Sequence, residues 1–366
     1  MQLIGIKEQY RLYKESIDQG IHQVLNEGNF IMGEQVKTLE KTLADFVGVK
    51  HCIAVSSGTD SLLIAMMALG IGPGDEVITV PFTFISSAEV IKFLGATPRF
   101  VDIDLDTYTI DVKKMASAIT PKTKAIIPVS LFGQMADCLS INAIAEQHKI
   151  PVIEDGAQSF GAAQYGKRSC GATTIGSTSF FPTKVFGCYG DGGAIFTDSD
   201  QLAHRMRLIR LHGSEEKYTH IHLGMNGRLD TLQAAILLAK FPRLDDELAA
   251  RRKIGERYSE HLQNVCITPT IQEGNTHVFS QYTIRVSNRD QLLEKTEEKA
   301  VPTAIYYPKC LHQQPVFSNL GYKTGDFPFS EQASKEVLSL PIHPWFSEED
   351  QDRVIEAVSA LSLLNV

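Results

Sequence analysis

The stretch HCIAVSSGTDSLLIAMMALG (residues 51–70) decides the fold, because it passes from a strand through a short turn into a helix. HCIAVSS is typical of a buried strand, and TDSLLIAMMALG of a helix that ends at Gly70. Ser57, Gly58 and Thr59 lie where this helix begins, and there free N–H groups and the helix dipole favour an anion such as phosphate. Ordinary capping by Ser or Thr explains the same residues equally well.

The alternation of strands and helices continues from about residue 36 to residue 200. The other predicted helices are VKTLEKTLADFVG (36–48), SSAEVIKFLG (86–95), KKMASAI (113–119) and INAIAEQHK (141–149). The other predicted strands are EVITVP (76–81), TPRFVDI (97–103), KAIIPVSL (124–131), IPVIED (150–155), TTIGSTSFF (173–181) and AIFTD (194–198). This pattern implies βαβ units, and therefore an α/β fold with a mostly parallel sheet and helices on both faces.

The last third of the chain has a different pattern. A long helix is predicted around RLDTLQAAILLAKF (228–241), and Pro242 interrupts it before the charged run RLDDELAARRKIGERY (243–258), which predicts a solvated helix. Short strands (QYTIRV, 281–286; TAIYY, 303–307) follow, with a final helix in SEEDQDRVIEAVSALSLL (347–364) that opens with a capping box. We therefore expect a large α/β domain over residues 1–240 and a smaller α+β domain over residues 241–366.

Composition narrows the function. A chain of 366 residues with 43% hydrophobic and 21% charged residues is typical of a soluble globular protein, and two domains are expected at this length. A net charge of −8 disfavours nucleic acid or an anionic membrane as partner. No run reaches the roughly 18 apolar residues of a membrane helix, and Lys7, Glu8 and Arg11 break up any signal-peptide pattern. The scattered cysteines predict free thiols in the cytoplasm, and no metal site is expected.

Two stretches place ionisable residues at the carboxyl edge of the predicted sheet, where ligands of α/β proteins bind. IPVIED ends in Glu154-Asp155, and Asp155 could ligate a metal, hold a ribose, pair with a buried cation or cap a turn. SFFPTKVFGCYGDGGA (179–194) delivers Ser179 and Lys184 to the same edge. A random lysine is most often solvated, but burial would lower the pKa of Lys184 and free its amine to attack an aldehyde. Together with a phosphate cradle, these residues fit pyridoxal 5′-phosphate (PLP).

At this point the chain resembles the nucleotide-sugar aminotransferases of the DegT/StrS family, which are fold type I PLP enzymes with an aspartate aminotransferase-like fold. Six motifs carry the resemblance, in family order and over almost the whole chain. They are SSGTDSL (56–62), PFTFISSAE (81–89), VIEDGAQSFGA (152–162), SFFPTKVFGCYGDGGA (179–194), GMNGRLDTLQAAIL (224–237) and PTAIYYPKCLHQQPVF (302–317).

The resemblance implies roles for the residues around the PLP ring. Lys184 would hold PLP as a Schiff base and, once freed, carry the proton between substrate and cofactor. Asp155 would pair with the ring nitrogen and keep it protonated. Gln158 would lie beside the PLP hydroxyl, and Phe84 would cover one face of the ring.

The resemblance also implies a shared active site in a homodimer. Gly58, Thr59 and Ser179 would hold the phosphate, and Asn226 would reach it from the partner subunit. Arg228, also from the partner, would meet a carboxylate of the amino donor or of the sugar, because its planar fork binds carboxylates in a bidentate way.

Tyr306, Tyr307 and His312 match the segment that contacts the nucleotide-sugar in this family. The implied reaction moves the amino group of L-glutamate, leaving 2-oxoglutarate, to C3 of a UDP-linked 3-keto sugar. GCYGDGGA resembles the C3-aminating members, nearest to those that use 2-acetamido-2-deoxy-3-keto-glucuronic acid for surface polysaccharide such as the O-antigen of lipopolysaccharide. Tyr306-Tyr307 leaves a dTDP-3-keto-6-deoxyhexose open as the alternative. A non-catalytic regulator is disfavoured by the intact motifs, and a sugar dehydratase by Lys184.

Overall fold

A computed structural model describes residues 1–360 of the chain. Its centre is a sheet built from a four-stranded part, in the order β1-β9-β8-β5, and a three-stranded part, in the order β3-β2-β4. Two parallel bridges, Ile126 to Val152 and Val129 to Asp155, join β4 and its continuation to the β5 segment. The strands are β1 (His51–Val55), β2 (Glu76–Thr79), β3 (Thr97–Phe100), β4 (Thr123–Ile126), β5 (Ile153–Asp155), β8 (Ile175–Ser179) and β9 (Gly193–Thr197).

The strand directions confirm the predicted mostly parallel sheet. β2 pairs in parallel with β3 and with β4, and β5 pairs in parallel with β8. β9 is the exception, because it runs antiparallel to both β1 and β8. A loop of residues 180–192, rather than a crossover helix, connects β8 to β9, and the chain direction reverses between these two strands.

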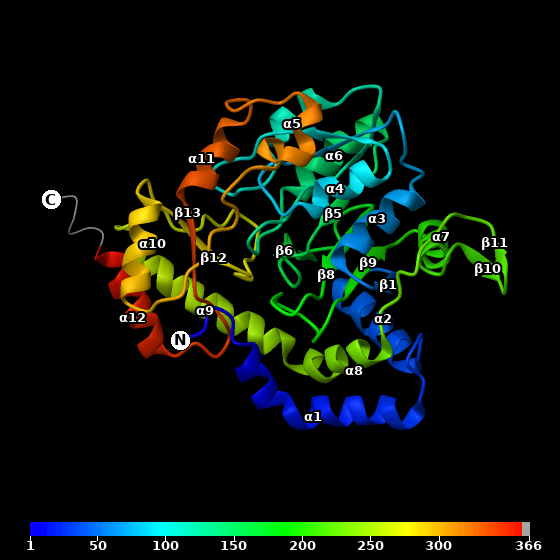
Figure 1. Cartoon of the computed structure of the whole chain (residues 1–366), viewed down its shortest axis with the longest axis horizontal. Coiled ribbons are helices and arrows are strands. Elements are labelled where there is room, and N and C mark those ends of the chain that lie inside the picture. The colour runs from blue at the N-terminus through cyan, green and yellow to red at the C-terminus, as the bar shows by residue number, and fades with distance from the viewer. Residues whose placement is uncertain (361–366) are drawn as a thin grey trace.

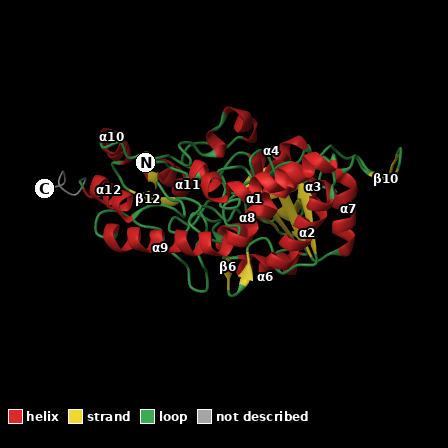
Figure 2. Ribbon diagram, turned by 90° about the horizontal axis from the view of Figure 1, so that it is seen from below, coloured by secondary structure: helices red, strands yellow, loops and turns green. Residues whose placement is uncertain are grey.

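Helices cover both faces of this sheet, as Figure 2 shows. Alternate residues of β1 point to opposite faces: Cys52 and Ala54 join a core with α2, whereas Ile53 and Val55 join a core with α3 and α7. This two-sided burial explains why the strands read as continuous apolar runs. The covering helices are α2 (Glu34–Val47), α3 (Gly58–Ala68), α4 (Ser86–Phe93), α5 (Val112–Ala118), α6 (Cys138–His148) and α7 (Asp200–Arg210).

An N-terminal helix that the sequence analysis did not predict, α1 (Ile6–Glu27), lies along α8 (Thr231–Lys240), as Figure 1 shows. The predicted interruption at Pro242 is confirmed, because a short 3-10 turn, η1 (Phe241–Arg243), separates α8 from α9 (Leu244–Leu262). α9 carries the chain from the sheet toward the C-terminal elements.

The C-terminal part combines helices with an antiparallel pair of strands, β12 and β13. TAIYY does not form a strand, and only a bridge from Ala304 to Ser339 remains of that prediction. The last predicted helix forms with Ser347 as its cap, but its positions 361–364 lie outside the described residues. The elements are β12 (Tyr282–Arg285), α10 (Arg289–Glu298), η2 (Leu311–Gln313), η3 (Pro315–Leu320), α11 (Pro328–Glu336), β13 (Val337–Leu340) and α12 (Glu348–Ser359).

Contacts run across the predicted domain boundary. The amide of Ile342 donates to the carbonyl of Leu3 at 3.4 Å, so the first residues lie against the C-terminal part. Cys310 and Val337 are buried in the same core as residues of β2 and β4. The division at residue 240 stays a prediction. In the described part of the chain, no helix is long and apolar enough to cross a membrane.

Candidate active site

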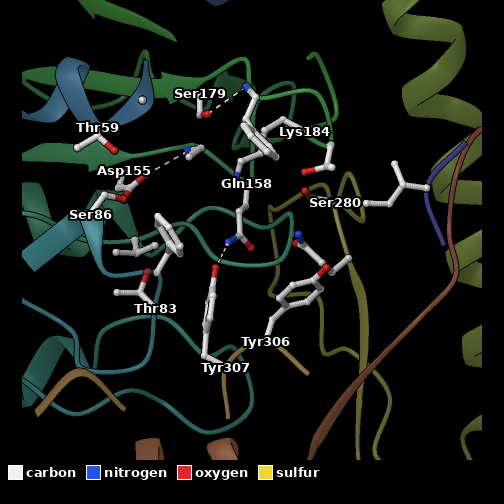
Figure 3. A pocket seen from close by; sticks show the side chains of 18 of the residues that line it. Thr59, Thr83, Ser86, Asp155, Gln158, Ser179, Lys184, Ser280, Tyr306 and Tyr307 are labelled. Carbon is white, nitrogen blue, oxygen red and sulfur yellow. Dashed lines mark hydrogen bonds between the residues drawn. The ribbon is translucent and has the colours of Figure 1, made fainter. Parts of the chain in front are cut away.

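A cavity of about 570 Å³ lies at the carboxyl ends of the central strands (Figure 3). Its wall comes from the N-terminal residues Leu3 and Ile4, from the sheet edge, and from the C-terminal part, which contributes Ser280 and Gln281 among others. The structure brings nine of the predicted site residues to this cavity: Gly58, Thr59, Phe84, Asp155, Gln158, Ser179, Lys184, Tyr306 and Tyr307.

Lys184 stands in the loop between β8 and β9, and its backbone N–H donates to the carbonyl of Phe181 at 2.9 Å. Burial lowers the pKa of the Lys184 amine, and the negative charge of Asp155 opposes that shift. Among the described residues, none accepts a hydrogen bond from Nζ of Lys184. An amine with a lowered pKa and no acceptor is suited to attack a carbonyl carbon.

Asp155 ends β5 and is 6% exposed. Its Oδ2 accepts a hydrogen bond from Oγ of Ser87 at 2.7 Å, and its Oδ1 accepts one from N of Ala157 at 3.2 Å. Burial raises the pKa of Asp155, whereas these two bonds and the Lys184 charge act in the opposite direction. A buried carboxyl held in this way would gain from a cationic partner. Ser87 was missed in the sequence analysis, although it lies within the PFTFISSAE motif.

The start of α3 shows both features expected from its sequence, a capping side chain and free N–H groups that could bind an anion. Oγ of Ser57 accepts a hydrogen bond from N of Asp60 at 3.0 Å, so Ser57 caps the helix. In the described structure the N–H groups of Gly58 and Thr59 have no acceptor and remain available to an anion. A Cβ on Gly58 would lie 2.6 Å from Cβ of Ser179, so only glycine permits this close approach.

Gln158 is held between the sheet and the C-terminal part. Its Oε1 accepts a hydrogen bond from N of Phe132 at 2.9 Å, and its Nε2 donates to the hydroxyl of Tyr307 at 3.0 Å, as drawn in Figure 3. The two bonds fix which side of the amide donates. The Tyr307 ring lies 6.2 Å from the ring of Phe84, which is 54% exposed.

Three predicted residues are not brought to the cavity. His312 is buried elsewhere, where its Nε2 lies 3.1 Å from Oε1 of Glu331, so its position gives no support to a substrate contact. Asn226 is exposed and forms an antiparallel β-bridge with Leu211. Arg228 forms an antiparallel β-bridge with Val55. Neither residue lines the cavity of its own chain. Their role in a partner subunit stays a prediction.

The charges of the cavity are unbalanced. Among the described residues that line it, Lys184 is the one lysine or arginine, whereas Asp155 and Asp191 both carry carboxyl groups. The cavity of one chain therefore has few cationic groups for a polyanionic substrate, although the free N–H groups at the start of α3 could bind an anion at one end.

These features fit PLP. The amine of Lys184 matches its aldehyde, the carboxyl of Asp155 matches its ring nitrogen, and the free N–H groups at the start of α3 match its phosphate. The fold and the site thus define a PLP-dependent aminotransferase of the α/β class.

Comparison with known proteins agrees with this class. The model of the DegT/DnrJ/EryC1/StrS aminotransferase family matches residues 12–359. The chain belongs to this family, as the sequence motifs indicated.

Several relatives match over nearly their full length. The chain is 50% identical to the UDP-2-acetamido-2-deoxy-3-oxo-D-glucuronate aminotransferase of Pseudomonas aeruginosa, covering 94% of this chain and 96% of the relative. It is 47% identical to a "pleiotropic regulatory protein" of Geobacillus stearothermophilus, covering 98% and 97%. It is 42% identical to the dTDP-3-amino-3,6-dideoxy-alpha-D-galactopyranose transaminase of Aneurinibacillus thermoaerophilus, covering 95% of each.

Among solved structures, NtdA from Bacillus subtilis with bound cofactor PMP superposes with a TM-score of 0.89 at 35% identity, covering 95% of this chain and 82% of that one. PMP is the aminated form of PLP, so a relative with this fold was observed carrying the amino group on its cofactor.

Proposed function

We propose that the protein transfers the amino group of L-glutamate to C3 of UDP-linked 2-acetamido-2-deoxy-3-keto-glucuronic acid. The observation that carries this proposal is the 50% identity, over 94% of the chain, to an aminotransferase named for that substrate. The cavity supports it, because its residues supply an amine, a buried acid and an anion site at one sheet edge.

PLP, when bound, supplies the aldehyde that takes up the amino group and a ring that accepts electrons. The residues of the chain do the rest. Lys184 would take a proton from the donor carbon and return one to the acceptor carbon, since its pKa is lowered by burial. Asp155, held by Ser87, would keep a proton on the ring nitrogen. Gly58, Thr59 and Ser179 would bind the phosphate, and Gln158 would bind the ring hydroxyl.

The enzyme is further proposed to act as a homodimer in which Asn226 and Arg228 of each chain serve the site of the other. The shortage of cations in the cavity supports this assembly, because Arg228 would supply the missing positive charge. The hairpin of β10 (Ser214–Glu216) and β11 (Thr219–His220) projects from the body of the molecule in Figure 1. Tyr218 at its tip is 84% exposed and Leu223 just after it is 90% exposed, as expected of surface that a second copy covers.

A cytoplasmic location and a role in surface polysaccharide synthesis, such as that of an O-antigen, belong to the same proposal. The six cysteines are free in the structure, which suits a reducing compartment. A dTDP-linked 3-keto-6-deoxyhexose is the second candidate acceptor, favoured by the 42% identity to a transaminase named for a dTDP-sugar. The relative with a regulatory name makes a non-catalytic regulator the contrasting outcome of the test.

The test is to load purified protein with PLP, add L-glutamate and measure 2-oxoglutarate per active site. Wild type should release about one equivalent, and Lys184→Ala none, because the amine that moves the proton is gone. The glutamate-treated protein is then given the UDP-linked keto-uronic acid or the dTDP-linked keto-hexose, and amino sugar is identified by mass spectrometry. Release of 2-oxoglutarate without amination of the UDP-sugar would reassign the substrate, and no release would favour the regulator.

A further inference from the structure

The loop that carries Lys184 is closed at its base and tightly wound. The N–H of Cys188 donates to the carbonyl of Phe180 at 2.7 Å, so the two ends of the loop of residues 180–188 are hydrogen-bonded to each other. Gly187 lies inside this turn, where an added Cβ would lie 2.4 Å from the carbonyl oxygen of Phe181. The position of Lys184 therefore depends on the conformation of a short closed loop.

A buried lysine from another element reaches this loop. Lys240, the last residue of α8, is 2% exposed, and its Nζ donates a hydrogen bond to the carbonyl oxygen of Gly187. The same Nζ lies 5.3 Å from the centre of the Tyr189 ring, within range of a cation–π interaction. Lys240 thus contacts the loop three residues beyond Lys184.

Lys240 and its charged neighbours together contain more positive than negative groups. Glu247 and Arg251 are buried on α9, and Gln9 and Tyr13 of α1 contact Glu247. Two cations thus share one carboxyl group, and none of the ion pairs found in residues 1–360 includes Lys240. Burial lowers the pKa of Lys240 to about 8, and Glu247 opposes that shift.

A buried ammonium without a direct carboxylate partner is costly, and a methionine of similar length would avoid that cost. The rest of α8, TLQAAILLA (231–239), is almost entirely apolar, so an apolar last residue would suit its packing. What methionine cannot do is donate a hydrogen bond to Gly187. The bond to the loop is thus the distinctive contribution of a lysine at this position.

We propose that Lys240 is a positioning residue that fixes the Lys184 loop through the carbonyl of Gly187. Lys240 does not touch the cavity; it acts on the reacting amine only by holding the backbone that carries it. This inference rests on the proposed role of Lys184 as the lysine that binds PLP.

The test compares Lys240→Met with a matched control on the same helix. Gln233 of α8 also contacts this region, accepting a hydrogen bond from N of Tyr189 at 3.0 Å, but beyond the base of the loop. Gln233→Met therefore removes the hydrogen bond between α8 and the backbone of Tyr189, and it leaves the contacts of residues 180–188 in place. Each apoprotein is mixed with PLP, and borohydride is added at intervals. The amine and the aldehyde condense with loss of one water, borohydride reduces the resulting C=N bond to a secondary amine, and mass spectrometry counts labelled Lys184.

Lys240→Met should label Lys184 about tenfold or more slowly than wild type, because small displacements of a reacting group reduce rates steeply. Gln233→Met should label at the wild-type rate. Hydrogen exchange of the apoproteins should quicken in residues 181–188 of Lys240→Met and nowhere else, which a general loss of stability would not produce. Wild-type labelling by Lys240→Met, equal slowing by both variants, or faster exchange throughout the molecule would each overturn the proposal.

A second variant and a second measurement keep the test decisive. If Lys240→Met does not fold, Lys240→Gln carries the same comparison, because its shorter side chain also withdraws the ammonium from Gly187. If wild type fails to label at Lys184, the proposed function fails, while hydrogen exchange still reports whether Lys240 holds the loop.

Discussion

Tyr307 and Tyr306 are neighbours that line the same cavity, yet only Tyr307 bonds to Gln158 among the described contacts. Tyr307→Phe removes one hydrogen bond from the amide of Gln158 and leaves the ring in place. A net hydrogen bond contributes about 1 kcal/mol, so PLP affinity should fall about fivefold. Titration of apoprotein with PLP, followed by its absorbance, measures this change. Tyr306→Phe is the control and should bind PLP as wild type does; equal losses in both variants would show that orientation of Gln158 is not the cause.

At the residue scale, the sequence predicted those site residues whose place follows from a nearby predicted strand. Asp155 is the last residue of one predicted strand and Lys184 lies three residues after the end of another, and the strand ends bring both to one cavity. Ser87 could not be found in this way, because its bond to Asp155 depends on how α4 lies over the end of β5. His312 was misplaced for a similar reason: its position in the chain gave no hint that its side chain turns toward Glu331.

At the scale of elements, the start of α3 makes a prediction about Gly58. Gly58→Ala would place a methyl group 2.6 Å from Cβ of Ser179, so the helix start or β8 must shift. Because the free N–H groups at this end are the proposed phosphate site, PLP affinity should fall at least about tenfold, measured by the same titration. Gly72→Ala is the matched control, since the nearest atom to its added Cβ is 3.9 Å away. Unchanged affinity in Gly58→Ala would contradict a phosphate site at α3.

The strands and helices were predicted correctly from the hydrophobic pattern where the sheet is buried on both faces. Strands β1 to β5 and the helices between them lie where apolar runs and helical spacing put them. TAIYY failed because an apolar run also describes a segment that lines a cavity: Tyr306 and Tyr307 face the site, and only Ala304 reaches β13. α1 was not predicted, and few of its residues are buried in the structure: Gln9, Ile17 and Val24.

At the scale of the whole molecule, the shared-site proposal predicts complementation between two inactive variants. Lys184→Ala lacks the amine, and Asn226→Ala lacks the proposed phosphate contact to its partner. In a mixed dimer, one site would combine the intact Lys184 of one chain with the intact Asn226 of the other. Coexpression should therefore restore about a quarter of wild-type activity, given random pairing in a two-fold dimer. Activity no higher than the mean of the separate variants would place Asn226 in its own chain's site or in none.

The arrangement of the two ends could not be read from the sequence. The elements of the α/β part were predictable because each has its own local apolar pattern, whereas the bond from Ile342 to Leu3 spans almost the whole chain. No local pattern marks such a pairing. The wall of the cavity is consequently the least predictable part of the site.

That wall has a consequence for how the protein is made. Leu3 and Ile4 leave the ribosome before the central sheet does, but Leu340 and Ile342, which line the same cavity and of which Ile342 bonds to Leu3, leave it long after that sheet. Contacts between such distant segments form late in folding. A nascent chain can therefore assemble the central sheet and the Lys184 loop during translation, yet it cannot enclose its cofactor until residues 340–342 have been made.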